Sequence, residues 1–239
     1  MNKWKSIWDG KNLETINLNE SEFDIFCDLK KADGFDVNIS NEKAYYMSFY
    51  NEWKERYQKI NTLIKGSIGS VYEVGCGSGV NLFLFQNRMR EDASFGGIDY
   101  SASLIDIAKR IIKSNDLVCG EAKNIDETIK YDFVMSDSVF QYFESIDYAE
   151  VVLRKMICKA DKLVYIGELH DSRLKEEWLE NRRKSMENYD EVYAGLSKMF
   201  YSREWIENIA KEFNRQVYFD ISDNKEYWNS KYIFNCYIY

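Results

Sequence analysis

Residues 71–82 read VYEVGCGSGVNL, and they determine how the rest of the chain can be interpreted. The first four contain two valines, which predicts a short strand, and three glycines then follow at alternate positions. The apolar segment behind the glycines predicts a helix that reaches Met89. A strand, a glycine turn and a helix form the first half of a nucleotide-type binding unit. Glycine is needed there because the backbone must turn sharply and let a ligand approach without Cβ atoms in the way.

The spacing of these glycines differs from the dinucleotide-binding pattern Gly-x-Gly-x-x-Gly, whose third glycine would fall at Val80. Here the glycines alternate, and Glu73 lies two positions before the first of them. This arrangement resembles motif I of the class I S-adenosylmethionine-dependent methyltransferases. S-adenosylmethionine has no pyrophosphate, so the turn has to admit an amino-acid moiety and a ribose instead of phosphates at a helix N-terminus.

A second strand is predicted by residues 94–101, which read SFGGIDYS. Its acidic residue, Asp99, lies about twenty residues beyond the glycine turn, the usual position of a carboxylate that accepts hydrogen bonds from ribose hydroxyls. Dehydrogenases share this feature, so it does not separate the two classes of enzyme.

Two later segments do separate them. Residues 117–122, LVCGEA, resemble the methyltransferase element in which an acidic residue after the third strand, here Glu121, meets the adenine amino group. Residues 131–138, YDFVMSDS, resemble the fourth-strand motif of the same family. Four elements in the right order, over residues 71–140, make the resemblance specific.

The resemblance implies that S-adenosyl-L-methionine is the cofactor, that its methyl group passes in line to an acceptor, and that S-adenosyl-L-homocysteine is released. Cys76 is expected as a small residue that fits the turn, because no basic partner that would activate its thiol lies nearby in sequence. The expected cofactor-binding residues are Glu73, Gly75, Cys76, Gly77, Gly79, Asp99, Tyr100, Ser101, Glu121, Ala122, Ser136 and Tyr46.

His170, the only histidine, follows the predicted fifth strand. Loops at the carboxyl ends of parallel strands line the ligand crevice of such sheets, and an unperturbed histidine pKa near 6.5 suits a general base. An acceptor hydroxyl would need such a base. The alternative is a histidine that caps the strand or the next helix. Glu168 and Asp171 could orient it, or could be ordinary carboxylates at a helix start.

Other candidates near the acceptor follow the fourth strand and lie in a basic cluster. The resemblance puts Asp137 and Tyr142 beside the methionine end of the cofactor and the acceptor, although Tyr142 fits a packed aromatic residue equally well. Arg182, Arg183 and Lys184 would suit a phosphate or carboxylate on the acceptor, or would form a solvated helix face.

From residue 71 onward, alternating strand and helix patterns indicate a mostly parallel sheet covered on both faces. The resemblance makes this a Rossmann-like sheet of seven strands whose last strand is antiparallel. We expect strands at 71–74, 94–98, 117–119, 131–136, 162–167, 216–221 and 231–239. Ser101 and Ser202 are predicted to cap helices.

We expect two parts: a helical leader at 1–65 and the methyltransferase domain at 66–239, with a helical insertion at about 171–200. Residues before Ser40 are read as mostly polar. Leader helices of this family often cover the cofactor cleft, so Tyr45, Tyr46 and Tyr50 are candidate contacts; an aromatic face buried on the main domain is the alternative.

Composition limits the partners. A net charge of −8 over 239 residues argues against nucleic acid, because no general basic field would displace phosphate counterions. Five scattered cysteines and one histidine predict no metal site and reduced thiols. Without a signal-like segment or a long apolar run, we expect a soluble cytoplasmic protein, monomeric or homodimeric.

The leading hypothesis is O-methylation of a small molecule. Residues 164–168, VYIGE, and 200–202, FYS, resemble bacterial methyltransferases of surface-polysaccharide and capsule pathways, which implies a sugar, phosphorylated or nucleotide-linked acceptor. The alternatives are N-methylation of a small metabolite, an NAD(P)-dependent reductase, which the missing third glycine disfavours, and a non-catalytic module, which Glu73 and Asp99 beside an intact glycine turn disfavour.

Overall fold

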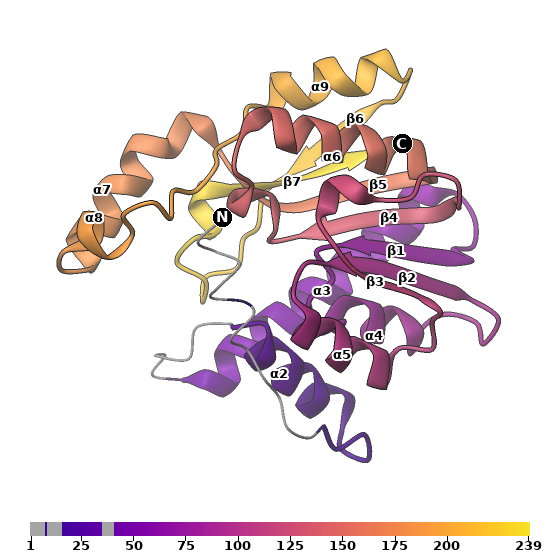
Figure 1. Cartoon of the computed structure of the whole chain (residues 1–239). Helices are drawn as coiled ribbons and strands as arrows, with labels where there is room; N and C mark the ends of the chain where they lie inside the picture. Colours follow the sequence, from indigo (N-terminus) through magenta and orange to yellow (C-terminus); the bar gives the residue numbers. More distant parts are fainter. Residues whose placement is uncertain (1–7, 9–15, 35–40) are drawn as a thin grey trace.

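A computed structural model describes residue 8 and residues 16–34 and 41–239. One seven-stranded sheet runs through the molecule in the order β3-β2-β1-β4-β5-β7-β6 (Figure 1). Neighbouring strands from β3 to β5 are parallel, and β7 is antiparallel to both of its neighbours. The strands are β1 Ser70–Val74, β2 Ser94–Asp99, β3 Asp116–Cys119, β4 Tyr131–Asp137, β5 Ala160–His170, β6 Val217–Asp220 and β7 Ile233–Ile238. The predicted Rossmann-like sheet, with its antiparallel last strand, is confirmed.

The register of the central strands brings their carboxyl ends together. Glu73 of β1 is level with Gly97 on β2 and with Met135 on β4. Val71 and Val74 are fully buried, as expected for a central parallel strand with both faces covered. The segments that follow these strands therefore meet at one edge of the sheet.

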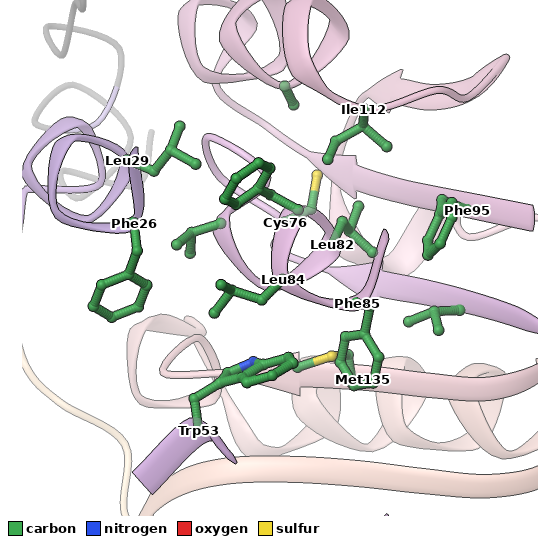
Figure 2. Packing of buried hydrophobic residues seen from close by; sticks show 14 of the residues in the cluster. Phe26, Leu29, Trp53, Cys76, Leu82, Leu84, Phe85, Phe95, Ile112 and Met135 are labelled. Carbon is green, nitrogen blue, oxygen red and sulfur yellow. The ribbon is translucent and has the colours of Figure 1, made fainter. Parts of the chain in front are cut away.

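One face of the sheet is covered by α4 (Val80–Gln86), α5 (Ala102–Ile111) and two leader helices, α2 (Glu22–Ala32) and α3 (Glu42–Ile64) (Figure 1). Figure 2 shows Trp53 of α3 beside Phe85 of α4, and their rings meet edge to face with centroids 5.2 Å apart. Phe26 and Leu29 of α2 belong to the same hydrophobic cluster. The leader helices therefore form part of the hydrophobic core that packs on the sheet, in addition to any role they have at the cleft.

The other face is covered by α6 (Ile146–Lys159) and α9 (Arg203–Glu212) (Figure 1). As predicted, the side chains of Ser101 and Ser202 accept hydrogen bonds from backbone N–H groups at the starts of α5 and α9. Short 3-10 turns lie at Ala122–Asn124 (η1), Phe140–Tyr142 (η2), Ser172–Leu174 (η3) and Ser230–Tyr232 (η4).

Between β5 and α9 the chain forms α7 (Lys175–Ser185) and α8 (Tyr189–Val192), in the segment where a helical insertion was predicted. These helices project beyond the end of the sheet and have a small cluster of their own around Trp178, Tyr189 and Tyr232 (Figure 1). No helix in the described part of the chain has the length and apolar character that a membrane crossing requires.

Candidate functional site

A cavity of about 780 Å³ opens where the central strands end at their carboxyl side. This volume lies in the range of pockets that enclose small ligands. We call one part of its lining the glycine-turn wall, made of Glu73, Gly75, Cys76, Gly77, Asp99, Tyr100, Glu121 and Ala122. We call another the insertion wall, made of Tyr142, Trp178, Arg182, Tyr189, Tyr193, Lys198 and Trp228.

The glycine turn cannot carry side chains at its first two glycines. Gly75 and Gly77 have φ values of 73° and 50°, in the left-handed region that favours glycine. A Cβ on Gly75 would lie 2.4 Å from a methyl of Val139, and one on Gly77 would lie 2.6 Å from Asp33 Oδ1. The Cβ directions of both glycines are therefore filled by Val139, just before η2, and by Asp33, at the end of α2.

Asp99 fixes the turn to the end of β2. Its carboxylate accepts hydrogen bonds from the backbone N–H groups of Gly77, at 2.9 Å, and Ser101, at 2.8 Å. A carboxylate can accept about four hydrogen bonds, so hydroxyl donors in the cavity can also be accommodated. Glu121 lines the cavity beyond β3 and accepts a hydrogen bond from the Tyr148 hydroxyl at 3.0 Å.

Two carboxylates of the cavity lining present a buried oxygen without a hydrogen-bond partner among the described residues, Glu73 Oε2 and Asp137 Oδ1. The other oxygen of each is held: Glu73 Oε1 accepts from Asn81 at 2.6 Å, and Asp137 Oδ2 pairs with Arg56 at 2.5 Å. Burial raises the pKa of Glu73 well above its usual range. Unsatisfied buried acceptors are costly, so this pair suits a ligand that brings hydrogen-bond donors or positive charge.

The surroundings of His170 do not suit a general base. Asn229 Oδ1 accepts from the Trp178 indole N–H at 2.8 Å, which orients the amide so that its N–H₂ donates to His170 Nε2 at 3.0 Å. The Nε2 lone pair is thus already occupied, and Nδ1 carries the proton. Burial is the main cause that lowers the His170 pKa to about 3. The ring lines the cavity as a neutral, fixed group, and this contradicts the basis of the predicted base role.

Glu168 lies next to a strained part of the backbone and does not orient His170. Glu168, near the end of β5, and Ser138, just after β4, have left-handed φ values of 57° and 59°. Glu168 Oε2 accepts from the Ser138 hydroxyl at 2.8 Å and from the Tyr227 hydroxyl at 3.2 Å. Burial foremost, with the charge of Asp137, raises the Glu168 pKa to about 7. Residues other than glycine that have left-handed φ values are found most often at functional sites.

The other predicted orienting residue, Asp171, points elsewhere and forms ion pairs with Arg173 and Arg203 at 2.7 and 2.6 Å. Tyr142 does line the cavity, and burial raises its pKa to about 12. Lys198, which sequence reasoning missed, lies with Nζ 3.5 Å from the Tyr142 ring centroid. No motif surrounds Lys198 in the sequence, so nothing there predicts that it belongs to a site.

Only one residue of the predicted basic cluster faces the cavity. Arg182 lines it, whereas Arg183 pairs with Asp190 at 3.0 Å and Lys184 with Glu180 at 2.6 Å on the exposed side of α7. Arg183 and Lys184 thus fit a solvated helix face, and of the three only Arg182 lies where an anion on the acceptor could reach it.

Four predicted cofactor contacts lie outside the residues that line the cavity. Gly79 begins α4 with φ 86°, and Ser101 caps α5. The Ser136 hydroxyl donates to the Val74 carbonyl at 2.8 Å, and Tyr46 is buried in the hydrophobic core. Tyr45, one position earlier on α3, lines the cavity instead.

Comparisons with known proteins agree with this geometry. Residues 71–157 match a family model described as a methyltransferase domain. Magnesium protoporphyrin IX methyltransferase from Synechocystis, solved with bound S-adenosylhomocysteine, has a similar fold, with a TM-score of 0.59 and 13% identity over 91% of this chain and 98% of that chain. The plantazolicin methyltransferase BpumL, also solved with S-adenosylhomocysteine, has a TM-score of 0.60 and 16% identity over 91% and 95% of the two chains.

The matches to curated proteins cover only a part of each of those proteins. Peramine synthetase ppzA of Metarhizium majus is 27% identical over 195 residues, which are 74% of this chain and 6% of that protein. Malonyl-[acyl-carrier protein] O-methyltransferase of Priestia megaterium is 26% identical over 98 residues, 40% of this chain and 35% of that one. The chain thus corresponds to a small part of the synthetase it matches.

Proposed function

From the premise that the chain carries a methyltransferase domain of the class I fold, we propose that it transfers a methyl group from S-adenosyl-L-methionine to the hydroxyl of a small-molecule acceptor. The observation that carries this proposal is the pair of unsatisfied buried oxygens on Glu73 and Asp137, beside a glycine turn that lines the same cavity. A ligand with an ammonium group and a sulfonium charge supplies what these oxygens lack.

The residues present fit that ligand. When bound, S-adenosyl-L-methionine supplies an electrophilic methyl group on its sulfonium. Glu73 and Asp137 hold its positively charged end, Asp99 accepts hydrogen bonds from its ribose hydroxyls, and Glu121 with Ala122 lines the adenine position. Gly75 and Gly77 line the cavity with backbone atoms only, so the cofactor can approach the main chain of the turn at these two positions. Its product would be S-adenosyl-L-homocysteine.

Glu168 is the proposed proton acceptor for the hydroxyl. Its pKa near 7 leaves much of it ionised at neutral pH yet able to take up a proton. Ser138 and Tyr227 line the cavity, and both donate hydrogen bonds to Glu168, so either can pass a proton from the acceptor. This supports O-methylation over N-methylation, since a neutral amine attacks without prior loss of a proton.

The test compares two ligands and then two variants. S-adenosylhomocysteine at about 100 times its Kd should raise the Tm by about 5–10 °C, because it binds only the folded state, whereas NAD should not. The opposite result would refute the methyltransferase assignment and favour a reductase. Glu73→Gln should weaken S-adenosylhomocysteine binding without changing the response to NAD.

Turnover then tests the acceptor chemistry. With an acceptor in hand, Glu168→Gln should lower kcat about a hundredfold or more while S-adenosylhomocysteine affinity is retained. His170→Gln, a change of similar size on the same strand, should alter kcat by less than about tenfold. Equal activity of Glu168→Gln and the parent would favour an amine acceptor. The prediction of a sugar or nucleotide-linked acceptor from surface-glycan synthesis rests on two short motifs, and turnover with sugar, nucleotide-sugar and other hydroxyl compounds tests it.

A further inference from the structure

The insertion wall brings two positive side chains and several aromatic rings to the cavity. Arg182 comes from α7, and Lys198 from the segment between α8 and α9. The rings come from α7, α8, η2 and the loop before β7: Trp178, Tyr189, Tyr193, Tyr142 and Trp228. The helices α7 and α8 project beyond the sheet (Figure 1), and Trp178, Arg182 and Tyr189 on them line the same cavity as the glycine-turn wall.

Arg182 is held by ring faces. Its guanidinium carbon lies 5.0 Å from the Trp228 ring centroid and 5.4 Å from that of Tyr189, with Tyr193 at 5.7 Å and Trp178 at 6.0 Å. These rings surround the guanidinium without neutralising its charge, and Tyr189 also accepts a hydrogen bond from it, so the group is held in place while it stays able to pair with an oxyanion. Among the described residues, no carboxylate forms an ion pair with it, although its neighbour Arg183 has one.

Lys198 adds a second positive group to the same wall. Burial is the main cause that lowers its pKa to about 7, and the positive charge of Arg182 lowers it by a smaller amount than the charge of Glu168 raises it. The opposing influence is the charge of Glu168, and Glu144 is a further carboxylate of the lining. Two like charges in a half-buried wall repel each other, and an anion between them would relieve both the repulsion and the desolvation.

We propose that the acceptor is a planar aromatic compound that carries an anionic group, either a carboxylate or a phosphate. Its ring lies against the aromatic side chains of the insertion wall, and its anion pairs with Arg182 and Lys198. The hydroxyl to be methylated then points from the ring toward the glycine-turn wall. This inference rests on the proposed methyl transfer and names the substrate class of the same cavity.

The experiment measures binding of matched acids and neutral analogues to the whole protein loaded with S-adenosylhomocysteine, by calorimetry or by tryptophan fluorescence. The carboxylate arm compares 3,4-dihydroxybenzoate with catechol, and the phosphate arm compares 4-hydroxyphenyl phosphate with hydroquinone. In at least one arm, the acid should bind about tenfold or more tightly than its neutral partner, the size expected of one charge-assisted pair. The arm that responds identifies the source of the anion.

Arg182→Gln should remove this preference, and Arg183→Gln, the adjacent and externally paired arginine, should retain it. S-adenosylhomocysteine affinity, measured separately, should be unchanged in both variants. The inference is overturned if acid and neutral analogue bind equally in both arms, if neither acid binds at millimolar concentration, or if Arg182→Gln keeps the preference. Failure of the parent protein to bind S-adenosylhomocysteine would instead count against the methyltransferase proposal.

Discussion

His170 shows how burial can change the role that a residue type suggests. A histidine after the fifth strand of such a sheet is a reasonable candidate base when only its position and its unperturbed pKa are known. In the folded chain it is 1% exposed and accepts a hydrogen bond from Asn229. These contacts come from residues almost sixty positions away, so no local pattern could reveal them.

The lowered pKa of His170 makes a prediction for stability. Its pKa is about 3 in the folded state against 6.5 when unfolded, so between these values only the unfolded chain binds the proton. Folding is therefore penalised as the pH falls through 6.5, and the penalty at pH 5 is about 2 kcal/mol. In His170→Gln the free energy of unfolding should fall less between pH 7 and pH 5, by about this amount, in urea titrations. An identical pH dependence in the two proteins would mean that His170 is protonated in the folded state.

The other site residues also fall into two groups: those whose position local sequence predicts, and those whose position depends on contacts with distant parts of the chain. The positions of Glu73, Asp99 and Glu121 at the cavity could be predicted because each lies at, or just beyond, the carboxyl end of a strand. Tyr45 could not be chosen over Tyr46, because the choice depends on how α3 is rotated against the sheet. Lys198 could not be found at all, because its position depends on the path of the insertion.

At the scale of elements, the strands were predictable because each is a short apolar run between turn signals. All seven expected strands are present within a few residues of their predicted ends. The reading of the segment up to about Ser40 as polar missed the buried apolar stripe of α2. Its signals were available: Ser21 caps it, and Ile25, Phe26 and Leu29 form a buried stripe at helical spacing.

The helix α3 is tied to the sheet by one buried ion pair, between Arg56 and Asp137 of β4. Their side chains are only 13% and 6% exposed, so removing one partner leaves the other charge buried. Arg56→Met should cost about 3–5 kcal/mol of unfolding free energy, and adding Asp137→Asn should recover part of that loss. The comparison is Arg90→Met, whose pair with Asp92 is exposed and should contribute less than about 1 kcal/mol. Losses that simply add in the double variant would mean that the two groups do not interact.

At the scale of the whole molecule, the division into a leader and a catalytic domain does not follow the hydrophobic core. Phe26 of α2 and Trp53 of α3 belong to one cluster with Phe85 of α4 and Met135 of β4 (Figure 2). The end of α2 also reaches the binding turn, where Asp33 Oδ1 accepts from the Ser78 backbone N–H at 2.7 Å. Residues before and after position 65 therefore stabilise the same structure.

A shared core predicts that the protein unfolds as one unit. Calorimetry should give a single transition, which S-adenosylhomocysteine shifts upward as a whole. Phe26→Ala, which empties a site that is 1% exposed, should cost about 3–5 kcal/mol and lower the Tm of that same transition by about 6 °C or more. Leu18→Ala is the matched control in the leader, because Leu18 is 54% exposed and its loss should leave the Tm nearly unchanged. If the leader were only a lid, Phe26→Ala would instead split off a separate early transition and leave the main one where it was.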